Sequence, residues 1–138
     1  MHSDFKLEVI TPERTFFNDN VQSVIIPTPD GQMEIQKGHE PIVVSIDIGT
    51  VRLLIDGKWH ECTTSEAFME VRPDETIIFS QAMEWPEEID LSRALAAKER
   101  AEERLRQQRS YQEYIQSKIA LARAMVRLKV GRRGQNLD

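Results

Sequence analysis

The stretch EEIDLSRA, residues 87–94, marks the point at which the sequence changes its pattern. Before it, short runs alternate apolar with polar residues. After it, alanine, glutamate and arginine dominate, and neither proline nor glycine occurs between Asp90 and Lys129. Aspartate is favoured directly before a helix, where its carboxylate accepts a backbone N–H of the first turn. We therefore predict a β-rich domain over residues 1–84, a hinge over 85–88 and a helical domain over 89–138.

The residues before this point predict an antiparallel β-sandwich or flattened barrel. Phe5, Leu7 and Val9 alternate with charged residues, which is the period of a half-buried strand. Asp56-Gly57 is typical of a tight hairpin turn, because glycine accepts a positive φ. Short strands without intervening helices favour a sandwich. We expect strands in FKLEVI (5–10), VQSVIIP (21–27), PIVVSIDI (41–48), TVRLLI (50–55), KWHECTT (58–64), AFMEVR (67–72) and TIIFSQ (76–81).

The residues after this point predict two helices that fold back as an antiparallel hairpin, so the fold class is α+β. Apolar residues step by three and four on either side of the polar break QQRS (107–110). A short break joins helices that lie antiparallel. Alanine buries little apolar area, so we expect weakly packed helices that can separate. The two apolar stripes are Ala94, Ala97, Ala101 and Leu105, then Tyr111, Ile115, Ile119, Ala122 and Val126.

The net charge of −5 is unevenly distributed along the chain. Residues 1–86 carry 6 Lys and Arg against 15 Asp and Glu, whereas residues 87–138 carry 12 against 8. An acidic body with a basic arm suggests two different partner surfaces, although a solvated helix of mixed charge has the same composition. The basic stretch lacks interleaved aromatic residues, so we expect no binding to nucleic acid.

Several kinds of chemistry are not expected from this sequence. It contains no P-loop motif, and its three histidines lack the companions and spacing of a zinc site. His60 and Cys62 are two residues apart, but no third group is nearby to orient them as a nucleophile and base. The longest apolar runs are too short to span a membrane. We interpret Trp59 and Phe68 as core aromatics.

Four stretches, in order over essentially the whole chain, resemble the epsilon subunits of bacterial rotary ATP synthases. They are LEVITPERTFF (7–17), DGQMEIQKGHEPIVVSIDIG (30–49), AFMEVRPDETIIF (67–79) and IDLSRALAAKERAEERL (89–105) together with IALARAMVRL (119–128). The resemblance implies a non-catalytic rotor subunit of the central stalk. Such a subunit couples rotation to catalysis and inhibits ATP hydrolysis through a mobile helical hairpin. It also implies a peripheral position at the cytoplasmic face of the cell membrane, without direct membrane insertion.

The junction itself is similar to the motif with which some of these subunits bind ATP. Guanidinium groups suit phosphate oxygens, and carboxylates can accept from an amine or a ribose hydroxyl. The plainer interpretation of Asp90 is a helix cap, and arginines four residues apart are often a solvated face. The resemblance implies ATP as a regulatory ligand and no metal or prosthetic group. Its residues here are Glu84, Ile89, Asp90, Arg93, Ala94, Arg123 and Arg127.

The resemblance also implies two contact surfaces for partner subunits. Asp30, Gly31, Gly38, His39 and Pro41 would dock the gamma subunit and the membrane ring of c subunits. A basic set on the helices would contact the catalytic alpha and beta subunits and inhibit hydrolysis. That set is Arg104, Arg106, Arg109, Lys129, Arg132 and Arg133. An alternative is a free-standing ATP sensor or adaptor with no synthase partner. A small hydrolase lacks the necessary acid and base residues.

Overall fold

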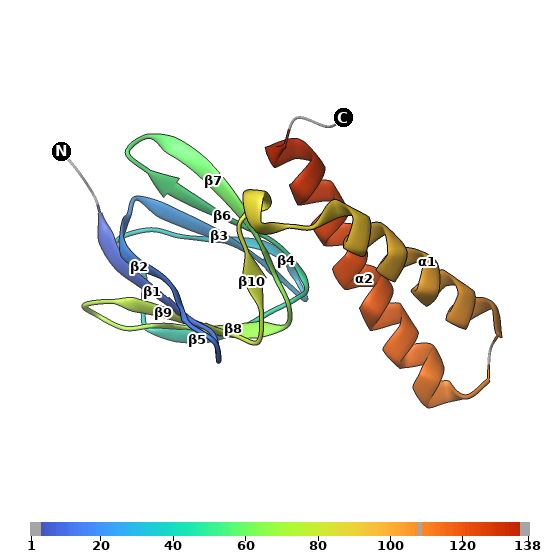
Figure 1. The fold of residues 1–138 in the computed structure, drawn as a ribbon. Helices are drawn as coiled ribbons and strands as arrows, with labels where there is room; N and C mark the ends of the chain where they lie inside the picture. Colours follow the sequence, from blue (N-terminus) through green and yellow to red (C-terminus); the bar gives the residue numbers. More distant parts are fainter. Residues whose placement is uncertain (1–3, 108, 136–138) are drawn as a thin grey trace. The chain divides into compact units, whose positions relative to one another are not determined.

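A computed structural model describes residues 4–107 and 109–135 of the chain, which form strands first and helices afterwards (Figure 1). The α+β prediction is confirmed. The strands are β1 (Phe5–Ile10), β2 (Thr15–Val21), β3 (Ser23–Thr28), β4 (Gly31–Ile35), β5 (Ile42–Ile46), β6 (Gly49–Ile55), β7 (Lys58–Thr64), β8 (Ala67–Val71), β9 (Thr76–Ser80) and β10 (Met83–Glu84). The helices are the 3-10 helix η1 (Pro86–Glu88), α1 (Leu91–Gln107) and α2 (Tyr111–Gly134).

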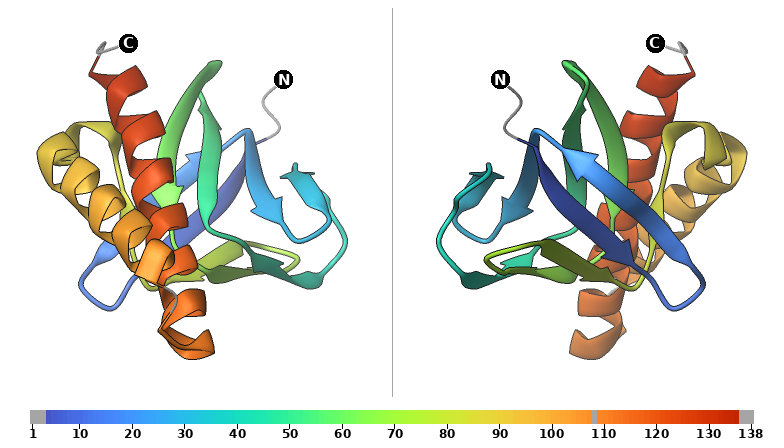
Figure 2. Two further views of the ribbon diagram at one scale, coloured as in Figure 1. Left: turned by 90° about the vertical axis from the view of Figure 1, so that its right-hand side faces the viewer. Right: turned by 90° about the vertical axis from the view of Figure 1, so that its left-hand side faces the viewer.

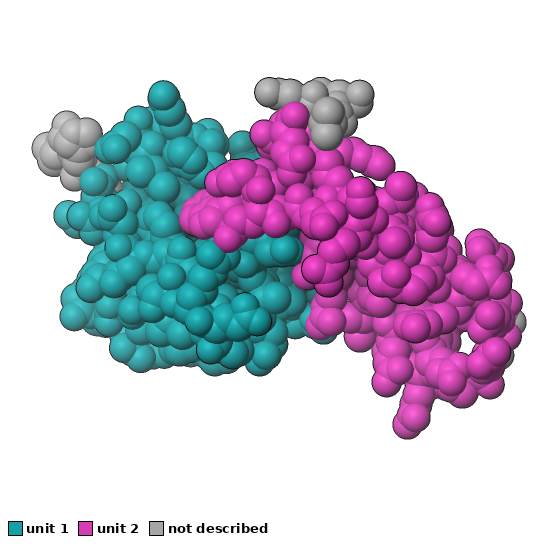
Figure 3. Space-filling model, viewed as in Figure 1, with its two compact units in different colours: residues 1–84 teal, residues 85–138 magenta. Residues whose placement is uncertain are grey.

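The chain divides into two compact units, residues 1–84 and 85–138, which Figure 3 colours separately. The first unit holds all of the strands just named, and the second holds η1, α1 and α2. Each unit buries apolar side chains of its own, such as Leu7 and Ile78 in the first and Ala101 and Leu128 in the second.

Two five-stranded sheets face each other in the first unit (Figure 2). One has the strand order β2-β1-β9-β8-β5 and the other β10-β7-β6-β3-β4. Neighbouring strands are antiparallel except β1 and β9, which are parallel. Alternation along β1 buries Leu7 and Val9 completely, whereas Lys6 is exposed and Glu8 is half-buried on the opposite face. The sandwich core therefore follows from the period-two pattern.

The Asp56-Gly57 turn confirms the hairpin expected between β6 and β7. Ile55 pairs with Lys58, which leaves two residues in the turn. Asp56 has a φ of 50° and Gly57 a φ of 78°, both in the left-handed region that a tight hairpin turn requires. The strands β1 and β7 have the bounds expected from sequence, whereas β2, β4 and β10 were not predicted. β2 contains Asn18-Asp19-Asn20 before its last residue, Val21. These residue types favour turns, so the sequence did not indicate a strand there.

The two aromatics interpreted as core residues are not in the core. Trp59 is 40% exposed and Phe68 is 47% exposed, so this prediction was wrong. In β8 the buried positions belong to Met69 and Val71, and the strand alternation turns Phe68 to the opposite face. Phe68 stacks there on Phe79 with ring centroids 5.1 Å apart.

The second unit is the predicted pair of antiparallel helices (Figures 1 and 2). The Asp90 carboxylate accepts the backbone N–H of Arg93 at 3.0 Å, which confirms its role as the N-cap of α1. Ser110 caps α2 in the same way, accepting the N–H of Glu113 at 3.1 Å. The break between the helices therefore falls where the sequence predicted it.

Buried alanines occur on both helices, but only the stripe of α1 consists of the expected residues. Ala94 and Ala101 are buried on α1, and Ala97 and Leu105 are half-buried. The predicted stripe of α2 was wrong, because Tyr111 is 78% exposed, Ile115 is 37% exposed and Ala122 is exposed. The buried residues of α2 instead include Ser117, Ala124, Leu128 and Gly131.

Candidate functional site

Most of the predicted nucleotide-binding residues of the second unit lie toward the hinge end of the hairpin, whereas Arg123 lies in the middle of α2. Gly131, near the end of α2, lies against Ile89 and Leu91 at the start of α1. A Cβ added to this glycine would lie 3.1 Å from the nearest Ile89 side-chain atom and 2.8 Å from that of Leu91. This contact fixes the register of the two helices.

The register places Arg127 beside the start of α1. Arg127 precedes Gly131 by four residues, or about 6 Å along the helix axis. Because the helices are antiparallel, moving back four residues along α2 corresponds to moving forward about four residues along α1. Arg127 is therefore level with Arg93 and Ala94. Arg123 lies one further turn along, and its guanidinium projects from the same helical face as that of Arg127.

The burial pattern puts these arginines on the same side of the hairpin. Each lies one position before a buried residue of the helix contact: Arg93 before Ala94, Arg127 before Leu128 and Arg123 before Ala124. One residue is a rotation of about 100° about a helix axis. Because the chain directions are opposite, that rotation turns to the same side of the hairpin on both helices. Helix geometry therefore places the three residues toward one edge of the helix pair.

Carboxylate chemistry is available at this edge too. Asp90 is exposed and directly precedes α1, three positions before Arg93. One of its oxygens accepts the Arg93 N–H, which leaves the remaining acceptor capacity of the carboxylate for a ligand. Guanidinium groups suit the phosphates of a nucleotide, and a carboxylate suits its amine or hydroxyl groups.

The other three residues of the predicted site differ in character. Ile89 is 5% exposed and Ala94 is 4% exposed, so both pack between the helices rather than offering a surface to a ligand. Glu84 belongs to the first unit, where it ends β10, pairs in register with Thr63 and is half-buried. Among these residues the structure records the hydrogen bond from the Arg93 N–H to Asp90, and the grouping of the others as a binding site stays a prediction.

The predicted docking residues lie in two loops rather than one. Asp30 and Gly31 form the turn from β3 to β4, where the Thr28 hydroxyl donates to the Gly31 carbonyl at 2.6 Å. Gly38, with a φ of 85°, and His39 lie beyond the opposite end of β4. Five residues of strand span about 16 Å. A partner that touches both loops would therefore have to span the length of β4.

Pro41, the last of these residues, is exposed directly before β5. Gly38 and His39 also line a hollow of about 370 Å³ with residues from the ends of β1, β8 and β9. Lys6, Lys37 and Arg72 share its lining with Asp4, Asp74 and Glu75, so its charge is mixed.

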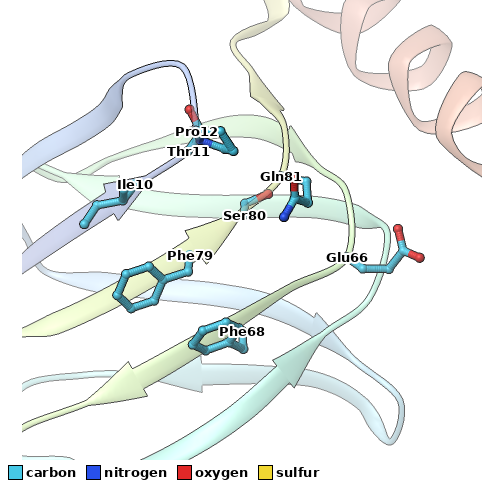
Figure 4. A pocket seen from close by; sticks show the side chains of 8 residues that line it. All are labelled: Ile10, Thr11, Pro12, Glu66, Phe68, Phe79, Ser80 and Gln81. Carbon is cyan, nitrogen blue, oxygen red and sulfur yellow. The ribbon is translucent and has the colours of Figure 1, made fainter.

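A second hollow, of about 270 Å³, opens on the sandwich beside β8 and β9 (Figure 4). Figure 4 shows the stacked rings of Phe68 and Phe79 along it, with Ile10 nearby. Its lining mixes these apolar side chains with the polar residues Thr11, Glu66, Ser80 and Gln81.

The single cysteine, Cys62, is expected to be unreactive in the folded protein. Burial raises the pKa of the Cys62 thiol, with a smaller contribution from the neighbouring Glu61 carboxylate. The thiol is fully buried and points its proton toward the Val51 carbonyl at 3.7 Å. His60 on the same strand is exposed. A thiolate nucleophile is therefore disfavoured at neutral pH.

The predicted inhibitory residues lie on both helices and in the break between them. Arg104 and Arg106 lie in the last turns of α1, Arg109 in the break, and Lys129 on α2. All four are exposed, as are Arg132 and Arg133 at the end of α2. Arg106 forms an ion pair with Glu103 at 2.6 Å, which also lowers the pKa of that carboxyl. Its charge is therefore partly compensated within the helix.

Comparison with known families covers nearly the whole chain. Residues 4–86 match the model described as the beta-sandwich domain of the ATP synthase delta/epsilon chain, and residues 87–131 match that of its long alpha-helix domain. The ATP synthase epsilon chain of Caldanaerobacter subterraneus subsp. tengcongensis is 49% identical over 138 residues, covering 99% of this chain and all of that one. The chain belongs to the epsilon-chain family of ATP synthases.

Further relatives agree with this assignment. The epsilon chain of Caldicellulosiruptor bescii is 49% identical over 128 residues, with 93% of each chain covered. Members of the epsilon-chain family are non-catalytic subunits, and the same holds for this chain.

Two solved structures share the fold. A chain of the Euglena gracilis mitochondrial ATP synthase, from a structure of its OSCP, F1 and c-ring, superposes with a TM-score of 0.79 at 24% identity, covering 92% of this chain and 80% of that one. A chain of the Tetrahymena thermophila central stalk and c-ring gives a TM-score of 0.53 at 11% identity, covering 62% and 69%.

Residues 4–107 and 109–135 contain neither a membrane-spanning helix nor a metal-binding cluster. None of their helices combines the length and the apolar character that a bilayer span requires. No group of three or more His, Cys, Asp or Glu residues is placed there to hold a metal ion.

Proposed function

We propose that this epsilon subunit, a component of the ATP synthase central stalk, couples rotation to catalysis and restrains ATP hydrolysis through its helical hairpin. The sandwich docks on the gamma subunit and on the ring of c subunits through the Asp30-Gly31 turn and the Gly38–Pro41 loop. The hairpin reaches the catalytic alpha and beta subunits when it opens. The complex holds the subunit peripherally at the cytoplasmic face of the membrane.

ATP is the ligand that decides the hairpin state. It binds to the edge formed by Asp90, Arg93, Arg123 and Arg127, and it needs both helices for its contacts. A ligand that binds only the closed state stabilises that state in proportion to its concentration. Abundant ATP therefore keeps the hairpin closed and the enzyme free to run, whereas scarce ATP lets the hairpin open and block hydrolysis.

The placement of the three arginines toward one edge of the helix pair, which follows from the burial pattern, supports this proposal. Arg93 lies on α1, whereas Arg123 and Arg127 lie on α2. Arginines that only form a solvated face on one helix would not need to lie toward the same edge as an arginine of the other helix. Family membership over the full length also favours a synthase subunit over a free-standing sensor. Purification of the native protein with gamma and catalytic subunits would support the former.

Titration of the isolated full chain with ATP tests the site. Charge-assisted hydrogen bonds contribute about 1.5–3 kcal/mol each, so Arg123→Ala with Arg127→Ala should weaken binding by roughly a hundredfold or more. Lys129→Ala is the matched control, because it removes a positive charge from the other side of α2 and should leave the affinity unchanged. Equal affinities of the double variant and the control would overturn the assignment.

A further inference from the structure

The last turns of α2 come unusually close to the segment that leads into α1. Beyond the contact of Gly131 with Ile89 and Leu91, a Cβ added to Gly134 would overlap the Pro86 ring of η1. Neither glycine has a positive φ, and both lie within α2, so neither serves as a left-handed helix cap. Space, not backbone freedom, explains why glycine occupies these two positions.

Gln135 completes the contact. Its side-chain amide donates to two backbone carbonyls of the facing segment, those of Pro86 and Ile89, each at 3.1 Å. The Pro86 carbonyl also accepts the N–H of Ile89 at 3.2 Å, so the amide joins a small network at the C-terminal end of η1. A glutamine that satisfies two carbonyls at once holds a chain segment in one geometry.

These contacts exist only while the helices lie together. Glycine within a helix is less favourable than alanine, so Gly131 and Gly134 weaken α2 taken alone. Close packing against Pro86 and Leu91 offsets that weakness in the closed hairpin. The Gln135 amide likewise exchanges its two carbonyls for water when the hairpin opens.

We propose that Gly131, Gly134 and Gln135 form a latch that closes the hairpin on residues Pro86–Leu91 without any nucleotide. The inference deepens the proposed function, since the segment that the latch holds is directly continuous with Asp90 and Arg93 at the ATP site. The latch sets the basal balance between closed and open hairpin, and ATP adds to it. Opening must then break the Gln135 hydrogen bonds before the helices separate.

Hydrogen exchange of the nucleotide-free full chain tests the latch. Gly134→Ala and Gly131→Ala should speed exchange of the Ile89, Arg93 and Ala94 amides by about tenfold or more, because the added methyl groups displace α2. Without a latch, the same substitutions would strengthen α2 and slow exchange, since alanine favours helix. Arg132→Ala is the matched control, because it changes an exposed residue between the two glycines. Unchanged or slower exchange in the glycine variants would overturn the proposal.

Gln135→Glu provides a second, nearly isosteric variant. It replaces a double donor with a carboxylate that faces two carbonyl acceptors, and exchange of the same amides should again rise about tenfold. Gln135→Lys keeps a donor and should restore much of the protection, and equal exchange in the two variants would contradict the role given to the amide. Unaltered exchange of the sandwich amides shows that each variant is folded.

The outcome separates from that of the ATP proposal. The exchange measurements contain no nucleotide. A negative result for the latch would therefore not affect the conclusion from the ATP titration of the arginine variants. If the exchange result supports the latch but ATP does not bind, the latch still closes the hairpin and only the proposed ligand is wrong. If both hold, the latch variants should also bind ATP more weakly, in proportion to the lost closed population.

Discussion

Asp90 combines two roles that a single substitution can separate. Its carboxylate caps α1 through the Arg93 N–H, and it also lies at the edge proposed to bind ATP. Capping requires a side-chain oxygen, which asparagine has, whereas binding by a charged acceptor requires the carboxylate. The choice between a plain helix cap and a nucleotide ligand is therefore open to experiment at this residue.

Asp90→Ala should lower the stability of the helical unit by about 1 kcal/mol, because it removes the cap. Asp90→Asn should keep the stability and yet weaken ATP binding. Urea unfolding followed by helical circular dichroism measures the first effect, and ATP titration measures the second. An asparagine variant with full ATP affinity would reduce Asp90 to a cap.

Cys62 makes the stability of the sandwich depend on alkaline pH. Burial raises the pKa of its thiol above the ordinary value of 9.0, so the unfolded chain releases this proton first as the pH rises. The contribution is fully present below about pH 9 and declines above it, by about 1.4 kcal/mol per pH unit.

Cys62→Ala should remove this decline. We expect the free energy of unfolding of the parent to fall more steeply between pH 9 and pH 10.5 than that of the variant, even though the variant starts from a lower value. Urea titrations at three pH values give both slopes. Parallel slopes would mean that the thiol ionises in the folded protein. Thiol reagents should likewise modify Cys62 only after unfolding.

At the scale of single elements, turns and caps follow from local chemistry, whereas the buried side of a helix does not. The Asp56-Gly57 turn forms because two residues with positive φ match the twist of β6 and β7. The Gly57 N–H also donates to the Gln22 side chain at 2.7 Å, which ties the turn to the end of β2. The aspartate-capped and serine-capped helix starts have the same local character.

Gly57→Val should destabilise the sandwich by roughly 1–3 kcal/mol, because a β-branched residue is strained at a φ of 78°. Lys58→Val, one position along and in extended β7, is the matched control and should cost little. Thermal unfolding of both variants gives the comparison. A loss confined to the control would mean that the turn does not require glycine.

On the scale of the whole molecule, the charge asymmetry separates an acidic sandwich from a basic helical arm. Exposed charge pairs are screened over about 10 Å at 0.1 M salt and about 3 Å at 1 M. A hairpin that inhibits hydrolysis through exposed arginines should therefore lose strength as salt rises. The Arg106 ion pair with Glu103 offers an internal comparison, since that charge is partly compensated already.

Arg104→Ala should relieve inhibition of ATP hydrolysis more than Arg106→Ala, and the difference should shrink at high salt. Hydrolysis by the assembled enzyme, measured at about 0.1 M and about 0.5 M KCl with each variant, reports both effects. If the degree of inhibition is the same at both salt concentrations in the parent and in the variants, apolar contacts would be favoured instead.

The sequence by itself determined the change from strands to helices, seven of the strands, the hairpin turn and the Asp90 cap, because each depends on a few neighbouring residues. It also carried the family motif that groups Asp90 with the arginines. Only the tertiary structure decided which side of α2 is buried, which aromatics stay outside, and why Gly131 and Gly134 are glycines. α2 has apolar residues on several sides, so the facing surface of α1 and η1 selects among them. From the sequence, two glycines near a helix end would be interpreted as a helix stop. The structure shows that the Pro86 ring packs against Gly134 and leaves no room for a side chain.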